Sequence, residues 1–400
     1  MDLRTDYPYP LLRKGIIKSY PSVKKQVHAD VVIIGAGITG ALVAYHLCKA
    51  GINAVVVDKR HVGMGSTAAS TSLLQYEIDV PLRELIKRVG EKNAIQSYLL
   101  CSDAITGIEK IDKRLGGETT FRSKPSFQYA SYKKDVAGLK EEYKRRKDAG
   151  FDIDWLESVE VEDRFGFKKP AGVFSAKGGE IDAYSFTHSL LNYCVKKELP
   201  VFDHTEIEKI KYHKRSVELL TADGIRIAAR KIIIACGYES GRFLSQKVEK
   251  FHSTYAIASE PLLSATNWYK DAVIWETATP YLYMRSTIDK RIIIGGKDED
   301  FYGAEMRDKS LPKKSLAIYK DFKKLFPAIP FRTDFKWAGT FASTKDGLPY
   351  IGVAPGVPNT YFALGYGGNG ITFSFLAANI ITDLINGTKN KHAEIFRFNR

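Results

Sequence analysis

The sequence predicts an α/β domain of the Rossmann type, interwoven with an α+β domain built on an antiparallel sheet. In VVIIGAGITG, which begins at Val31, a short apolar strand pattern leads through a glycine-rich turn into a helical pattern. Between about 251 and 335 the chain instead carries strand patterns rich in Tyr, Ile and Trp, with few helical stretches between them. At 400 residues, the chain is long enough for two domains.

The composition is that of a globular protein, with 44% hydrophobic and 26% charged residues. The cysteines, Cys48, Cys101, Cys194 and Cys236, have no metal-like spacing, so we expect reduced thiols, a cytoplasmic setting and no metal. The N-terminus lacks the apolar core of a signal peptide. The uncharged stretch from Val31 to Cys48 is explained by its glycine turn, so we expect no transmembrane segment.

The net charge of +14 comes from Lys and Arg dispersed along the chain, with clusters such as 144–147 and 313–314. Most of these clusters are typical of solvated helix faces. A positive field can steer an anionic partner. No recognised nucleic-acid-binding module accompanies the charge, so we expect no nucleic-acid partner.

The elements follow in order along the chain. Residues 1–28 have the pattern of an irregular arm, because prolines interrupt any period. The βαβ unit then comprises a strand at Val31–Ile34, a helix at Ile38–Ala50 ended by Gly51, and a strand at Ala54–Val57. Later expectations are helices at Asn93–Leu115, Lys133–Lys147 (charged and exposed), Ser185–Lys197, Ser315–Phe326 and Ile371–Ile385, an extended stretch at Thr119–Ala130, a strand near Val201, hairpin strands through Arg230, the apolar run Ile232–Ala235 and a strand at Tyr361–Ala363.

This order predicts two discontinuous domains. We assign 29–92, 170–250 and 337–400 to the Rossmann-like domain. The second domain takes 93–169 and 251–336, and 1–28 remains an arm.

Gly35, Gly37 and Gly40 form a GxGxxG directly after a strand and at the opening of a helix. Gly35 permits the tight turn, Gly37 lets the backbone approach a pyrophosphate, and Gly40 allows close helix–strand packing. The helix N-terminus offers free N–H groups to the phosphates. Asp58 ends the second strand, where an acid suits a ribose diol. The pattern predicts dinucleotide binding.

The dinucleotide itself stays open on this motif alone. Lys59 and Arg60 follow Asp58 and can reach a 2′-phosphate, as in an NADP enzyme. The carboxylate of Asp58 repels that phosphate, which favours FAD or NAD.

Five ordered motifs make the chain similar to the D-amino-acid-oxidase-like flavoproteins, a family that includes glycine oxidase, sarcosine oxidase and gamma-glutamylputrescine oxidase. They are ADVVIIGAGITG, VVVDKRHVGMGST, IIIACG, WAGTFASTKDGLPYIG and YFALGYGGNGITFS, between about Ala29 and Arg397. The resemblance implies FAD, oxidation of a carbon–nitrogen bond in a small amine or amino acid by hydride transfer to the flavin, and oxygen or another electron acceptor. The resemblance and the fingerprint together assign the following residues to the cofactor: Gly35, Ala36, Gly37, Ile38, Thr39, Gly40, Asp58, Lys59, Arg60, Gly65, Ser66, Thr67, Glu206, Ile207, Ala235, Cys236, Gly237, Gly367, Gly368, Asn369, Gly370, Ile371 and Thr372.

Two attachment points known in the family are replaced. Gly339 stands where sarcosine oxidase has its flavin-linked cysteine, and Ala69 stands where related dehydrogenases have a linking histidine. His46 and His61 do not match these positions. The resemblance therefore implies non-covalent FAD.

The substrate side departs further from the family. Tyr281, Tyr283 and Arg285 share one strand face by the two-residue period, and if that face lines the flavin the tyrosines form walls and Arg285 attracts a carboxylate. A solvated sheet face is the alternative. Gln75 stands at the position of a substrate-carboxylate arginine of sarcosine oxidase and is a weaker candidate.

Other family anchors are also absent. Phe341 replaces the carboxylate-binding arginine of glycine oxidase, Thr372 replaces a lysine of sarcosine oxidase, and Ile293 replaces the lysine that helps that enzyme react with oxygen, with Lys297 the nearest alternative. Either Arg285 replaces the anchors, or the substrate is an amine without a carboxylate at that place. An NADP-linked dehydrogenase, a dehydrogenase using an acceptor other than oxygen and a basic binding protein remain as alternatives.

Overall fold

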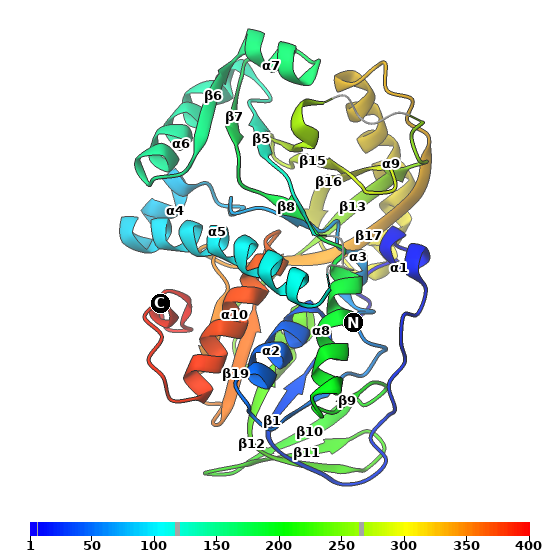
Figure 1. Ribbon diagram of the computed structural model, residues 1–400, viewed down its shortest axis with the longest axis vertical. Coiled ribbons are helices and arrows are strands. Elements are labelled where there is room, and N and C mark those ends of the chain that lie inside the picture. Colours follow the sequence, from blue (N-terminus) through cyan, green and yellow to red (C-terminus); the bar gives the residue numbers. More distant parts are fainter. Residues whose placement is uncertain (6, 117–120, 264–267) are drawn as a thin grey trace.

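The computed structural model describes residues 1–5, 7–116, 121–263 and 268–400, and its elements form two layered halves built on two large sheets (Figure 1). In the lower half, β1 pairs in parallel with β12 and β2, β2 with β9, and β12 with β19. The described strands of this first sheet are β1 (Val27–Ile34), β2 (Ala54–Val57), β9 (Val201–Phe202), β10 (Ile207–Tyr212), β11 (Val217–Thr221), β12 (Arg226–Ile234), β18 (Tyr350–Val353) and β19 (Thr360–Leu364).

The parallel strands are buried on both faces, as their continuous apolar runs predict. All four residues of Val31–Ile34 and all four of Ala54–Val57 are buried. One face is covered by α2 (Ile38–Lys49), α8 (Ala183–Lys196) and α10 (Gly370–Ile385). The βαβ unit thus forms as predicted, with β1 starting four residues early.

The upper half contains the second sheet, in which β5 and β14 pair in parallel and all the other described neighbours pair antiparallel. The sheet is therefore mixed, not purely antiparallel. Its described strands are β5 (Ser126–Tyr129), β6 (Ile153–Glu157), β7 (Ala171–Ser175), β13 (Lys250–Ser259), β14 (Val273–Glu276), β15 (Leu282–Ser286), β16 (Ile292–Asp300) and β17 (Thr333–Ser343).

The second sheet corrects the expected domain boundaries. The boundary at 170 separates β7 from its neighbours β5 and β6, and the boundary at 337 cuts through β17. A third, short sheet joins the halves through β3 (Leu73–Leu74), β4 (Arg122–Ser123) and β8 (Gly179–Glu180).

The remaining helices show where local pattern misleads. The helix expected at Ser315–Phe326 is α9 (Ala304–Leu325), which continues through Pro312 although proline removes a helix hydrogen bond. The other described helices are α1 (Tyr9–Lys14), α3 (Ser66–Ala69), α4 (Leu82–Val89), α5 (Glu91–Arg114), α6 (Val136–Asp148) and α7 (Ser158–Phe165). Thr119 and Thr120, the start of one expected extended stretch, lie outside the described residues.

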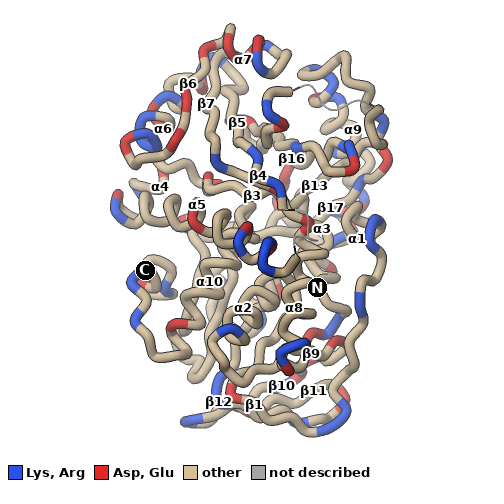
Figure 2. Tube along the Cα trace, viewed as in Figure 1, with Lys and Arg blue, Asp and Glu red and all other residues tan. Residues whose placement is uncertain are grey.

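The helix α6 was expected to be exposed to solvent, but part of it is buried. Arg146 is buried at 1% exposure, because its guanidinium contacts the carboxylates of Glu77 and Glu142 at 3.3 and 3.5 Å. Elsewhere Lys and Arg are scattered over both halves (Figure 2). In the described part of the chain, no helix is both long enough and apolar enough to span a membrane.

The arm also differs from the expectation of irregular chain. It carries the short helix α1 and packs on the body of the protein through buried Leu3 and Tyr9. The N–H of Thr340 donates to the carbonyl of Leu3 at 2.9 Å, so the arm runs along β17.

Candidate active site

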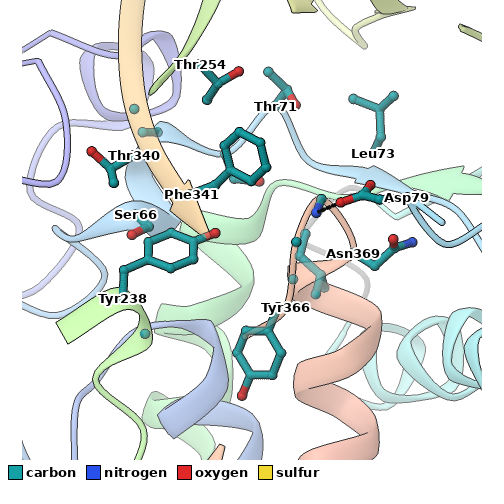
Figure 3. Close-up of a pocket in the computed structure, with 18 of the residues that line it drawn as sticks. Ser66, Thr71, Leu73, Asp79, Tyr238, Thr254, Thr340, Phe341, Tyr366 and Asn369 are labelled. Atoms are coloured by element: carbon teal, nitrogen blue, oxygen red, sulfur yellow. Dashed lines mark hydrogen bonds between the residues drawn. The ribbon is translucent and has the colours of Figure 1, made fainter. Parts of the chain in front are cut away.

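A cavity of about 670 Å³ lies between the two halves, within the range of ligand sites in proteins. The ends of β1, β2 and β12 line one part, and residues of β13 to β17 line another. Figure 3 shows Phe341 and Tyr238 projecting into it from different elements, with Asp79 and Asn369 at one side. Its lining includes residues predicted from the sequence to bind the cofactor and residues predicted to bind the substrate.

The glycine turn has the geometry that a dinucleotide requires. Gly35 adopts φ +111°, in the region that favours glycine, and a Cβ there would overlap the carbonyl oxygen of Ala235. A Cβ on Gly40 would overlap the carbonyl of Gly35. Gly37 differs, because its Cβ would meet only the hydroxyl of Thr67 at 3.0 Å, from the cavity side. Gly35 and Gly40 therefore shape the turn, whereas Gly37 leaves room for a ligand.

Asp58 is held at the end of β2 by two backbone donors. The N–H of Ala36 and the N–H of Arg60 donate to its carboxylate at 2.6 and 2.8 Å. Burial raises the pKa of Asp58, and these hydrogen bonds oppose the shift. The carboxylate lines the cavity beside the turn, where a ribose hydroxyl can donate to it.

Lys59 and Arg60 are already neutralised by Glu239. The Nζ of Lys59 and the Nη1 of Arg60 each lie 2.8 Å from its carboxylate. Burial alone raises the pKa of Glu239, but the hydrogen bonds from Arg60 and Lys59 outweigh it and lower the pKa to about 2. Both cations are thus paired, which argues against a 2′-phosphate site.

The segment after β2 supplies hydroxyls to the cavity. The N–H of Ile38 donates to the Thr67 hydroxyl at 3.0 Å. The Ser66 hydroxyl is buried and has no hydrogen-bond partner among the described residues, although it lines the cavity (Figure 3). An orphaned hydroxyl beside a glycine turn fits an absent oxyanion such as a pyrophosphate.

Glu206 and Ile207, which the family resemblance assigns to the cofactor, both line the cavity. Their carbonyls already accept, from the Ala222 N–H at 2.9 Å and from Arg242 at 2.9 Å. Cys236 also lines the cavity, and its thiol donates to the carbonyl of Ile34 at 3.2 Å.

Twenty of the expected cofactor residues line the cavity. The exceptions are Ala36, Gly40 and Thr372. Ala36 orients Asp58, Gly40 lies under the turn, and the buried Thr372 hydroxyl donates to the carbonyl of Asn369 at 3.0 Å. These three support the lining from behind.

The two family attachment positions converge. Gly339 and Ala69 both line the cavity, and a Cβ on Gly339 would lie 3.9 Å from the Cβ of Ala69. Neither residue offers a nucleophile.

Three of the four residues predicted to contact the substrate line the cavity, and one does not. Tyr281, Tyr283 and Gln75 line the cavity, and the two tyrosine rings lie 5.7 Å apart between centroids. Arg285 does not line it. Its guanidinium donates to Glu180 and to the carbonyl of Thr71, each at 2.7 Å. The period of two gives the strand face but not the position along the strand, and Arg285 lies beyond the cavity, at the third sheet.

Sequence analysis missed two acids, Asp79 and Asp298, on the cavity wall. The N–H of Gly368 donates to Asp79 at 2.7 Å (Figure 3), and Thr254 hydrogen-bonds Asp298. Burial raises the pKa of Asp79, and burial with the nearby charge of Asp79 raises the pKa of Asp298 to about 6. Asp79 follows Gln75 closely in sequence, but nothing in RIIIGGKDED marks Asp298 as inward-facing.

Three potential metal ligands lie outside the cavity. The Nδ1 of His61 is 3.1 Å from the carboxylate of buried Asp203, and His204 completes a group whose ligand atoms lie within 4.8 Å of one another. Sequence analysis, which expected no metal, did not anticipate this grouping.

Comparison with known proteins agrees with the geometry. The family described as FAD dependent oxidoreductase (DAO) matches residues 30–384. The chain belongs to this family. Its cofactor is therefore FAD, and its class is that of FAD-dependent oxidoreductases.

Relatives of this family member match over most of their length. Glycine oxidase of Geobacillus kaustophilus is 24% identical, covering 89% of this chain and 92% of the relative. Gamma-glutamylputrescine oxidoreductase of Escherichia coli K12 is also 24% identical, covering 92% and 86%. The crystal structure of the Geobacillus glycine oxidase has a TM-score of 0.77 at 18% identity, covering 91% of this chain and 96% of the other, so the folds are alike.

Proposed function

We propose that this flavoprotein oxidises the carbon–nitrogen bond of a small amine or amino acid to an imine, with FAD held without a covalent bond. The observation that carries the proposal is one cavity that is lined both by the dinucleotide turn and by aromatic residues. The part of the cavity lined by Tyr281, Tyr283 and Phe341 is called the chamber below. The names of the relatives above, an amino-acid oxidase and an amine oxidoreductase, support the same class.

The residues that would hold FAD follow from their places in the cavity. Asp58 would accept from the ribose, while Gly37, Ser66 and Thr67 would face the pyrophosphate. The loop Gly367–Gly370 leads into α10, whose N-terminus favours negative charge on the cofactor. Gly339 and Ala69 give no covalent anchor.

FAD supplies the chemistry of a two-electron acceptor, taking a hydride from the carbon next to nitrogen. The chain must hold that carbon close and favour the neutral amine. Phe341 and Leu73 provide apolar surface in the cavity, and such surface disfavours an ammonium. Burial raises the pKa of Tyr283 to about 12 and that of Tyr281 further, so both phenols stay protonated and act as donors, not bases.

The alternative of an NADP-linked dehydrogenase has less support, since Glu239 occupies both Lys59 and Arg60. The electron acceptor is a separate question. Ile293 is buried in a core cluster, and Lys297 pairs with Asp321 outside the cavity, so neither brings a lysine to the chamber.

Product analysis tests the proposal. The purified holoprotein is incubated with secondary amines or amino acids and an artificial electron-accepting dye, and the products are identified by mass spectrometry. We expect one carbonyl product, formed by hydrolysis of the imine, per two electrons accepted. Substrate recovered unchanged across primary amines, secondary amines and amino acids, from protein that contains FAD, would contradict the proposal.

A further inference from the structure

The acidic wall of the cavity, near Tyr281 and Tyr283, carries two acids, Asp79 and Asp298, neither of which forms an ion pair among the described residues. Asp298 comes from β16 and Asp79 from the segment after β3, and both face the cavity. The Oδ1 of Asp298 is buried and has no hydrogen-bond partner among the described residues. A buried carboxylate oxygen without a partner is costly, so a cationic group that binds there gains a strong interaction.

Other acids of the cavity wall have cationic or hydrogen-bond partners, although the Oε2 of Glu77, like the Oδ1 of Asp298, is buried and has no hydrogen-bond partner among the described residues. Arg146 pairs with Glu77 and Glu142. Glu276 accepts from the Ser131 hydroxyl and the Leu282 N–H at 2.8 and 3.0 Å. Unlike Glu77, whose carboxylate pairs with Arg146, Asp298 has no ion-pair partner among the described residues.

Of the described cations that line the cavity, all but the exposed Lys134 are engaged with other groups. Lys59 and Arg60 pair with Glu239, and Arg242 binds the carbonyl of Ile207. Arg83 donates to the carbonyl of Gly138 at 3.0 Å, and Lys134 is exposed. Outside the cavity, the charge of Lys314 acts to lower the pKa of Asp298, but the ammonium of Lys314 pairs with Glu299 at 2.7 Å.

Aromatic rings complete the acidic wall. Tyr281 hydrogen-bonds Asp79, and the Tyr283 ring packs over the backbone of Gly295, on the strand that carries Asp298. Aromatic faces next to carboxylates suit an alkylammonium, which gains both a charge-assisted hydrogen bond and a cation–π contact. A carboxylate in the same place would lie against two acidic side chains.

We infer that Asp298 and Asp79 form a subsite for a second nitrogen in its protonated ammonium form, so that the preferred substrates are amines with two nitrogens and no carboxylate near this wall. One nitrogen binds as a cation at the subsite, and the other is oxidised in its neutral form. The inference rests on the proposed function and narrows its substrate class. It also explains how the cavity works with Phe341 in place of an arginine and with Arg285 bound to Glu180.

Three probes of equal length separate the possibilities. They are N-methyl-1,4-diaminobutane, N-methylpentylamine and 4-(methylamino)butanoic acid, which end in an ammonium, a methyl group and a carboxylate. Dissociation constants are measured on the FAD-loaded protein from the perturbation of the flavin spectrum, and anaerobic flavin reduction is followed in the same samples. We expect the ammonium probe to bind at least about tenfold more tightly than the methyl probe, and the acid probe to bind most weakly.

Asp298→Asn should abolish that tenfold preference, and Asp79→Asn should weaken it. Asp300→Asn is the matched control, because Asp300 lies on the same strand but faces Lys250 outside the cavity, and the preference should persist in it. Equal FAD content in the variants shows that they are folded.

Equal binding of the three probes, tightest binding of the acid probe, or a preference that survives Asp298→Asn would overturn the inference. Flavin reduction without any such preference leaves the proposed function standing. A preference that depends on Asp298, with no flavin reduction by any probe, would support the subsite while contradicting amine oxidation.

Discussion

Asp298 keeps a carboxylate where burial and the charge of Asp79 both disfavour its ionisation, with only the Thr254 hydrogen bond and distant Lys314 opposing. Because its pKa is raised from 3.8 to about 6, the folded state binds its proton more tightly than the unfolded state does. Asp298 therefore lowers the free energy of unfolding progressively as the pH rises from about 4 to 6. Above about pH 6 this loss of stability is constant.

Asp298→Asn should remove this cost. We expect the variant without substrate to be more stable than the native protein by about 1 to 3 kcal/mol at pH 7.5, with the difference disappearing towards pH 4. Urea unfolding of both proteins across this pH range measures it. A difference that is the same at both ends of the range would show that Asp298 ionises normally.

Arg285 has a structural role in this account. It pairs with Glu180, which is also contacted by Lys124 and Arg122. Arg285→Met should destabilise the fold by about 1 to 3 kcal/mol, less than breaking an isolated buried pair, because two cations remain beside Glu180. It should change the binding of ammonium-, methyl- and carboxylate-ended amines by equal factors. Selective weakening of the acidic probe would instead restore Arg285 as a carboxylate anchor.

At the scale of the element, β1, the glycine turn and α2 separate packing from ligand binding. Gly40→Ala should prevent folding, because its Cβ would overlap the Gly35 carbonyl. Gly37→Val should fold but bind no FAD. Its side chain would point into the cavity, at the place where the backbone must come close to the pyrophosphate. Circular dichroism and flavin content of both variants check this contrast. A yellow, folded Gly37→Val protein would show that the turn serves structure alone.

This βαβ unit could be predicted from sequence because its glycines, its caps and its apolar runs are local. The start of α9 could not, since Pro312 marks an end of helix that the packing of α9 on the second sheet overrides. The prediction that Arg146 is exposed was wrong for a similar reason. A run of basic residues gives no sign that Glu77, far away in sequence, neutralises one of them.

On the scale of the whole molecule, both sheets contribute to one cavity, and the acidic wall exists only because segments far apart in the sequence meet there. The cofactor residues were predictable because they occur in short ordered motifs. The substrate wall was not, because Asp79 and Asp298 are more than two hundred positions apart and meet only in the folded chain.

FAD bridges these halves in the proposed complex, so removing it should loosen the molecule. With free FAD at a hundred times its dissociation constant, the folded state gains about 2.7 kcal/mol over the apoprotein. Thermal melts with and without added FAD measure the gain. Acid denaturation should release intact FAD into the supernatant, because Gly339 and Ala69 offer no anchor. Flavin that remains with the precipitate would reveal a covalent bond.

The central claim, that this cavity oxidises carbon–nitrogen bonds, is tested most directly by mixing the FAD-loaded protein with substrates in the absence of oxygen. The visible absorbance of the flavin is followed by stopped flow with a secondary amine and with a 2-hydroxy acid of matching length. We expect the amine to bleach the flavin and the hydroxy acid to do so far more slowly. Faster bleaching by the hydroxy acid, or none by any amine or amino acid, would contradict the account.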